Sequence, residues 1–208
     1  MVREQLVSRG IRDPAVLQAM RDVPRHAFVP DDLRRHAYDD GPLAIGEGQT
    51  ISQPYVVAKM IEALELRMTD RVLEVGTGSG YAAAILARIA SVVFTVERRS
   101  SLRQGAAERL ARLGFAAVRV GDAGMDLGWP AEAPFDAILV SAGAPQVPPA
   151  LREQLAIGGR LVIPVGDRPD RQRLIRVVRA AANDWLERSF GEVSFVPLVG
   201  REAWGADR

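Results

Sequence analysis

The sequence contains no cysteine among its 208 residues. This absence excludes disulfide bonds, thiol nucleophiles and cysteine metal sites together. Histidine is almost as scarce, because only His26 and His36 are present and neither lies at a spacing typical of metal ligands. We therefore expect surface or packing roles for both histidines, and no metal site.

Strong net charge and long apolar runs are absent too. The formal net charge is +1 at pH 7, which implies no general affinity for nucleic acid or for a membrane surface. Arg88 interrupts the longest candidate for a membrane span. The first ten residues are charged and amphipathic, unlike a secretory signal peptide. We therefore expect a soluble cytoplasmic monomer with no nucleic-acid or membrane partner.

The length of the chain limits its domain organisation. A chain of 208 residues is typical of one domain and is long enough to bury an apolar core. No repeat or interdomain linker is visible in the sequence. We expect a single domain over residues 1–208, in which residues 1–55 form helices and a functional loop and residues 56–208 form the core and the edge strands.

The most informative stretch is RVLEVGTGSGY at residues 71–81. Val72, Leu73 and Val75 form a short apolar run that is typical of a buried strand. Gly76, Gly78 and Gly80 follow it, and residues 81–90 are strong helix formers. Because glycines allow a tight turn and the close approach of a ligand, strand, turn and helix together predict a nucleotide-type pocket.

The spacing of the glycines indicates which ligand this pocket binds. A dinucleotide fingerprint needs a glycine at position 81, where this chain has Tyr81. Glu74 lies two residues before the first glycine, and its carboxylate suits a cation better than a pyrophosphate. The pattern resembles motif I of class I S-adenosylmethionine-dependent methyltransferases, whose ligand carries a sulfonium and an ammonium. A purely structural glycine turn in another α/β protein is the alternative.

Apolar strands and amphipathic helices alternate along the rest of the chain. Apolar runs predict strands at 92–96, 116–120, 135–140 and 160–165, and polar–apolar alternation predicts antiparallel strands at 174–178, 185–190 and 193–199. Helices are expected at 2–9, 14–22, 56–64, 100–113 and 148–155, the second capped by Asp13. The sequence therefore predicts an α/β fold, a doubly wound Rossmann-like sheet of about seven mostly parallel strands with an antiparallel edge.

Polar residues stand where the predicted parallel strands end. Glu74 and Gly76 belong to the end of the first strand, and Glu97, Asp122 and Ser141 follow at the ends of the next three. In a doubly wound sheet these ends share one edge, and ligands bind there. Glu97 lies roughly 20 residues after the glycines, a spacing at which an acid hydrogen-bonds a ribose diol. We expect a nucleoside-containing ligand at this edge.

A second polar, glycine-rich stretch lies at residues 46–55 and precedes an amphipathic helix. Ser52 lies two residues before Pro54, so it is a sound candidate for the N-cap of that helix. The stretch is also long for a simple connection, and such loops often carry function. These residues alone leave both interpretations of Ser52 open.

Together these motifs resemble the protein-L-isoaspartate O-methyltransferase family over nearly the whole chain. The matching segments are GQTISQPY at 48–55, VLEVGTGSGY at 72–81, VER at 96–98, APFDAILV at 133–140, GGRLVIPVG at 158–166 and FVPLV at 195–199. The resemblance implies a class I sheet whose last two strands are exchanged relative to the usual order. It also implies S-adenosylmethionine-dependent methylation of the free α-carboxylate of L-isoaspartyl residues in damaged proteins and peptides. The ester then cyclises to a succinimide, which opens partly to aspartate.

The resemblance assigns roles by position. Ser52 matches the catalytic serine. The matches that bind S-adenosylmethionine are Thr50, Ile51, Glu74, Gly76, Thr77, Gly78, Ser79, Gly80, Glu97, Asp122 and Ala123, with Glu97 at the ribose and Asp122 and Ala123 at the adenine. Ser52, Val196, Leu198 and Val199 match positions around the isoaspartyl residue. Ala123 departs from the family's usual Gly-Asp-Gly, and no histidine stands shortly after Ser52, so we expect no histidine base.

Methyl transfer to a carboxylate needs little chemical assistance, because the carboxylate is already ionised at neutral pH. What the protein supplies is in-line positioning and a dry site, and Ser52 suits an orienting role. One alternative is a related enzyme that methylates an encoded aspartate of a peptide partner. Another is a non-catalytic S-adenosylmethionine-binding module, which the presence of Ser52 and of FVPLV disfavours.

Overall fold

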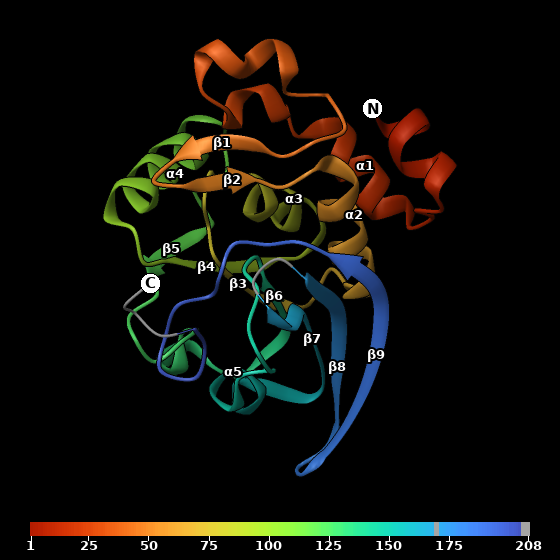
Figure 1. Ribbon diagram of the computed structural model, residues 1–208, viewed down its shortest axis with the longest axis vertical. Coiled ribbons are helices and arrows are strands. Elements are labelled where there is room, and N and C mark those ends of the chain that lie inside the picture. Colours follow the sequence, from red (N-terminus) through yellow and green to blue (C-terminus); the bar gives the residue numbers. More distant parts are fainter. Residues whose placement is uncertain (169–170, 205–208) are drawn as a thin grey trace.

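The described residues, 1–168 and 171–204 of this computed structural model, contain a mixed sheet of seven strands (Figure 1). Its strands are β3 (Arg71–Val75), β4 (Val92–Glu97), β5 (Arg119–Asp122), β6 (Phe135–Val140), β7 (Leu155–Arg168), β8 (Arg171–Ala181) and β9 (Asp184–Val193). Their order is β5-β4-β3-β6-β7-β8-β9. The first five strands in this order are parallel to one another. β8 then pairs antiparallel with β7, and β9 pairs antiparallel with β8 at the edge of the sheet. The predicted α/β sheet is confirmed. Residues 169–170 and 205–208 of the predicted domain lie outside the described residues.

Helices cover both faces of this sheet, which explains why its central strands are apolar at successive positions. Val72 and Leu139 belong to a core beneath α1 (Pro14–Asp22), α2 (Pro54–Ala63) and α3 (Tyr81–Ile89). Leu73 and Ile138 point to the opposite core, which includes Leu151 of α5 (Pro149–Glu153). α4 (Ser100–Arg112) adds Leu110 to the first core. No helix among the described residues is long and apolar enough to cross a membrane.

The N-terminal region is helical, as predicted, but only in part α-helical. Residues Val2–Leu6 form a π-helical turn (η1) and Val7–Arg9 a 3₁₀ turn (η2). α1 begins at Pro14, and the carboxylate of Asp13 accepts hydrogen bonds from the backbone N–H groups of Ala15 and Val16 at 2.8 and 3.1 Å. The predicted cap is confirmed. Two further 3₁₀ turns, η3 (Arg25–Phe28) and η4 (Asp31–His36), lead toward the hairpin that follows.

The stretch predicted as a long loop is a β-hairpin that leads into a helix. β1 (Leu43–Gly46) pairs with β2 (Gln49–Ile51), and the turn between them has positive φ at Glu47 and Gly48. α2 then begins at Pro54 with Gln53 at the N-cap position and no side-chain cap hydrogen bond. The N-cap interpretation of Ser52 is therefore wrong, because this serine lies one residue too early.

Three predicted boundaries differ from the structure, two of them because a turn shortens the predicted element. β5 begins at Arg119 rather than at 116, since Val118 N–H donates to Phe115 O at 3.0 Å and closes a turn. The helix predicted over 148–155 ends at Glu153. β7 already begins at Leu155 and continues through an irregular register before the predicted strand at 160–165.

The predicted edge strand at 193–199 is wrong. β9 ends at Val193, and the chain then crosses the carboxyl ends of the sheet, between it and the β1–β2 hairpin (Figure 1). Gly143 holds this crossing segment, because its N–H donates to Val196 O at 2.8 Å and its carbonyl accepts from Leu198 N–H at 2.7 Å. The buried side-chain amide of Gln172 bonds both backbone groups of Phe195. The segment thus pairs with a loop and a side chain instead of with β9.

Candidate active site

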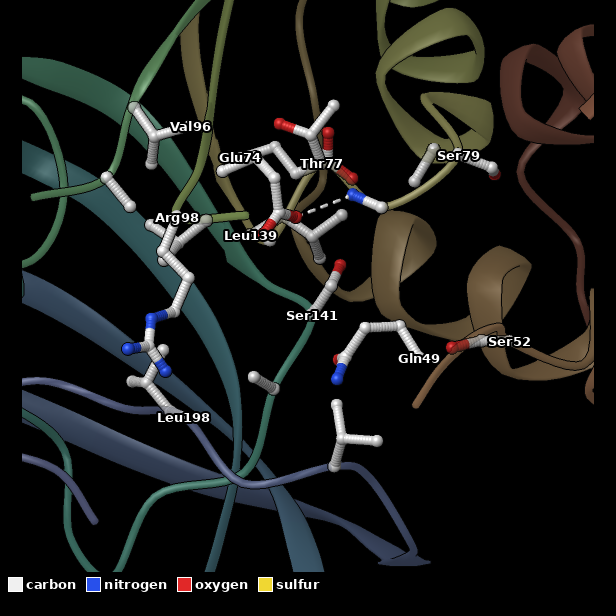
Figure 2. A pocket seen from close by; sticks show the side chains of 18 of the residues that line it. Gln49, Ser52, Glu74, Thr77, Ser79, Val96, Arg98, Leu139, Ser141 and Leu198 are labelled. Carbon is white, nitrogen blue, oxygen red and sulfur yellow. Dashed lines mark hydrogen bonds between the residues drawn. The ribbon is translucent and has the colours of Figure 1, made fainter. Parts of the chain in front are cut away.

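A cleft lies at the carboxyl ends of β3, β4 and β6 (Figure 2). The glycine turn forms one wall, the hairpin and Ser52 form another, and the crossing segment after β9 closes the cleft. Most residues predicted for the site line it: Thr50, Ile51, Ser52, Glu74, Gly76, Thr77, Gly78, Ser79, Glu97, Ala123, Val196, Leu198 and Val199. The fold therefore gathers residues that lie up to three-quarters of the chain apart, and only Gly80 and Asp122 are not among the lining residues.

The glycine turn needs glycine for conformational reasons. Gly76, Gly78 and Gly80 have φ values of 98°, 52° and 87°, in the left-handed region that side chains disfavour. Val96 O accepts from Gly76 N–H at 2.9 Å, which ties the turn to β4. Gly80 does not line the cleft but allows α4 to pack closely, because a Cβ at this position would lie 3.2 Å from Leu110 of α4.

Glu97 combines a structural and a binding position. Its side chain is 7 % exposed at the end of β4 and lines the cleft. Its carboxylate accepts from the N–H groups of Gly78 and Arg99, both at 3.0 Å. A carboxylate offers about four acceptor positions, so two remain for the hydroxyls of a ligand.

Glu74 is the most deeply buried acid of the site, 1 % exposed at the wall of the cleft. Thr95 Oγ1 donates to it at 2.7 Å, and Thr77 Oγ1 lies 2.6 Å from Thr95 Oγ1. Burial raises the pKa of Glu74 to about 8, and the hydrogen bond from Thr95 opposes this shift only in part. Because a nearby cation favours the ionised form, a positively charged ligand in the cleft would lower this pKa.

Asp122 lies beside the cleft rather than in it. Its carboxylate accepts from Gly124 N–H at 3.0 Å and pairs with Arg103 of α4. Both contacts lower the pKa of Asp122, and its side chain is 62 % exposed. The neighbouring Ala123 does line the cleft. The strand-end pattern therefore located the correct loop, while the side chain at its start points toward α4.

Several lining residues were not predicted. Gln49 lies at the cleft, and Arg98 extends toward Leu198 on the opposite wall (Figure 2). Ser141 also lines the cleft, as its place at a strand end predicts. Gln49 lies in the same motif as Ser52, and Arg98 directly follows Glu97, so adjacency in sequence could have identified both. Tyr81, Leu127 and Pro197 also line the cleft. Tyr81 and Pro197 belong to the matching segments at 72–81 and 195–199, whereas no sequence signal distinguishes Leu127 from a packing residue.

A second, wider cavity opens from the first. Thr50, Ser52, Ser141 and Val196 line both cavities, so they mark the passage between them. Beyond this passage the second cavity is bounded by Arg9, Tyr55, Lys59 and the chain from Glu192 to Phe195. Ser52 is therefore placed to contact a molecule in either cavity.

A glycine turn after the central parallel strand, with an acid at the end of the next strand, is the arrangement of class I S-adenosylmethionine-dependent methyltransferases. The sequence profile of the protein-L-isoaspartate(D-aspartate) O-methyltransferase family matches residues 1–203. This chain belongs to that family.

Relatives and solved structures agree with this family. A protein-L-isoaspartate O-methyltransferase 2 of Pelobacter propionicus is 58 % identical over 204 residues, which is 98 % of this chain and 91 % of the relative. A protein-L-isoaspartate O-methyltransferase of Methylorubrum extorquens is 60 % identical over 200 residues, 96 % and 86 % of the two chains. A solved protein-L-isoaspartate O-methyltransferase superposes with a TM-score of 0.84 at 28 % identity, covering 98 % and 67 %. A Plasmodium falciparum structure in complex with S-adenosyl-L-homocysteine gives 0.80 at 26 % identity, covering 94 % and 95 %.

Proposed function

We propose that this chain transfers the methyl group of S-adenosylmethionine to the free α-carboxylate of L-isoaspartyl residues in damaged proteins and peptides. The observation that carries the proposal is the meeting of two cavities at Ser52 and Ser141. The first cavity, which we call the donor cleft, has the walls expected for a nucleoside with a cationic tail, and the second, which we call the acceptor groove, is open to a polypeptide. The family and the S-adenosylhomocysteine complex of a relative support the same reaction.

The residues of the donor cleft fit the methyl donor, which supplies a methyl group on a sulfonium. We assign Glu97 to the ribose hydroxyls, because its carboxylate keeps free acceptor positions at the cleft wall. The turn from Gly76 to Gly80 borders the methionine part, and Glu74 lies where a cation would favour its ionised form. We assign Ala123, which lines the same cleft, to the adenine.

The chemistry at the passage needs no base. A carboxylate oxygen attacks the methyl carbon, the carbon–sulfur bond breaks, and the electron pair stays on sulfur, so an anion and a cation give two neutral products. The chain contributes orientation and exclusion of water, and the Ser52 hydroxyl orients the carboxylate. The methyl ester then loses methanol as the next backbone nitrogen attacks it. Water opens the resulting succinimide to aspartate or isoaspartate.

Selection of isoaspartate follows from how an acceptor is held. The crossing segment at 195–199 is fixed by Gly143 and Gln172, so it offers a rigid edge at Val196, which lines both cavities, while Leu198 and Val199 lie on its donor-cleft side. A peptide held along this edge by its backbone brings its carboxylate to the passage only if the carboxylate arm has the isoaspartyl length. The aspartyl arm is longer by one methylene and overshoots.

This proposal is tested by radiolabelled methyl transfer to two peptides that differ only in isoaspartate or aspartate at one position. We expect a preference for the isoaspartyl peptide of ~10²-fold in rate, because a misplacement of about 1 Å costs this much. Comparable methylation of both peptides would overturn the proposal. Transfer to an aspartate in one partner peptide alone would favour the related enzyme that modifies an encoded aspartate.

The proposal includes three predictions from the sequence alone. We propose a monomer, a single domain over 1–208, and a cytoplasmic location without nucleic-acid or membrane partners. The near-zero formal charge supports the last point. Light scattering of the purified protein measures the first, and a mass of twice that of the chain would contradict it.

A further inference from the structure

The acceptor groove extends well beyond the passage at Ser52. Its volume is about 570 Å³, within the range of sites that hold drug-sized ligands, so several residues of a peptide fit. Three charged side chains line it: Arg9, Lys59 and Glu192. Their partners decide what charge the groove presents to a peptide.

Two of these charges are compensated within the protein. Arg9 pairs with Asp40 at 2.8 Å and lies over the Tyr55 ring at 3.5 Å. Glu192 lies 3.7 Å from a guanidinium nitrogen of Arg171. The groove therefore gains little net charge from either residue.

Lys59 is different. Its ammonium lies 5.6 Å from the centre of the Tyr55 ring, and no described residue supplies a carboxylate or hydrogen-bond acceptor within bonding distance of it. The side chain is half-buried on α2. Lys59 is also the only lysine in a chain with 27 lysines and arginines. A cation that is partly removed from water and lacks a partner is a ready binding position for an anion.

We infer that Lys59 binds a carboxylate that flanks the isoaspartyl residue of the acceptor, and so makes acidic damaged peptides preferred substrates. The inference rests on the proposed function and names a substrate class for the same site. Lys59 lines the groove but not the donor cleft, whereas Ser52 and Ser141 line both. The reacting carboxylate thus belongs at the serines, and Lys59 meets a second carboxylate farther along the peptide. Either an acidic side chain or the peptide's C-terminal carboxylate supplies it.

Kinetics on matched isoaspartyl peptides test this assignment. One series carries glutamate or glutamine at each of the two positions on either side of the isoaspartate, with amidated ends. A second compares free and amidated C-termini. We expect at least one carboxylate to lower KM about three- to fivefold in low salt, with kcat unchanged and the effect reduced in 0.5 M NaCl.

Three variants locate the effect. Lys59→Met should abolish the preference, Lys59→Arg should retain it, and Arg67→Met should leave it intact, because Arg67 is exposed in a loop outside both cavities. A preference that survives in Lys59→Met would overturn the inference. So would an equal rise in KM for every peptide, because it would place Lys59 at the reacting carboxylate.

A binding measurement separates this inference from the proposed function. Because the chain has one lysine, ¹³C-lysine labelling gives one set of side-chain NMR signals, which report on Lys59 without any turnover. The glutamate peptide should shift these signals more than its glutamine partner does. A shift without methyl transfer would keep the groove assignment and reject the proposed reaction. Methyl transfer with equal shifts for the two peptides would keep the proposed reaction and reject the assignment of Lys59 to a flanking carboxylate.

Discussion

The donor cleft and the acceptor groove share a passage but are built in different ways. One wall of the donor cleft comes from a continuous segment, from β3 through the glycine turn to Tyr81, and the other walls come from distant segments. The groove combines Arg9, Tyr55, Lys59 and the chain after β9, with no comparable continuous segment. Local sequence therefore specifies one wall of the first cavity, whereas folding of distant segments completes that cavity and creates the second.

The two cavities also differ in charge. Two buried acids, Glu74 and Glu97, line the donor cleft together with Arg98 and Arg99. The groove is lined by Arg9, Lys59 and Glu192, and among the described residues Lys59 has no carboxylate partner. In the proposed reaction, the two acids would therefore face the cationic donor and Lys59 an anionic part of the acceptor.

The largest effect is expected at the passage itself. Ser52→Ala should lower kcat by about 10²-fold, because loss of the orienting hydroxyl loosens the in-line geometry. Since Ser52 does not cap α2, the melting temperature should stay unchanged, and initial rates measured beside thermal melts show both. Ser101→Ala is the matched control, because that hydroxyl bonds Glu47 outside the donor cleft. A lower melting temperature together with normal turnover in Ser52→Ala would show that Ser52 has a purely structural role.

The next largest effect should distinguish a carboxylate that lines the donor cleft from one that lies beside it. Glu97→Ala should weaken S-adenosylhomocysteine binding by ~1.5–3 kcal/mol, roughly ten- to a hundredfold, because it removes a charged hydrogen-bond acceptor. Asp122→Ala should change this affinity little, since Asp122 pairs with Arg103 outside the cleft. Isothermal titration calorimetry measures both. Equal losses would show that the two carboxylates act together on the ligand.

A smaller effect should appear in the pH dependence of stability. Burial raises the pKa of Glu74 to about 8 in the folded protein, whereas the unfolded chain ionises near 4.5. The folded state thus holds a proton that the unfolded state loses, so stability is full below pH 4.5 and falls as the pH rises toward 8. Glu74→Gln should lack this loss.

We expect the stability difference between wild type and Glu74→Gln to change by about 1 kcal/mol or more between pH 5 and pH 8, or ~2–4 °C in melting temperature. Thermal melts at several pH values measure it without ligand. Parallel pH profiles for the two proteins would mean that Glu74 is already ionised in the free cleft.

The elements predicted correctly are those whose signals are local. The strand before Gly76 and the helix after Gly80 depend on an apolar run, left-handed glycines and helix formers. Asp13 caps α1 through its own neighbours. Such features need no partner far along the chain, so a window of a few residues contains their cause.

The errors arose where a distant partner decides the conformation. Alternation of polar and apolar residues predicts a strand at 193–199, yet these residues leave the sheet because Gly143 and Gln172 bind their backbone groups. Asp122 occupies the expected strand end and pairs with Arg103, and the cleft is lined instead by its neighbour Ala123. The type of a residue determines which groups it can bind, whereas the tertiary structure determines which of these groups lie within hydrogen-bonding distance.

The sequence by itself determined the α/β order, the glycine turn and the acidic strand ends, because backbone sterics and hydrophobic periodicity act over a few residues. Only the tertiary structure decided that Ser52 borders two cavities, that the segment after β9 closes them, and that Lys59 faces the groove with no carboxylate partner among the described residues. These three relations join segments separated by much of the chain. They exist because burial of both faces of the sheet brings those segments together, and no short-range property of the sequence encodes the distance between them.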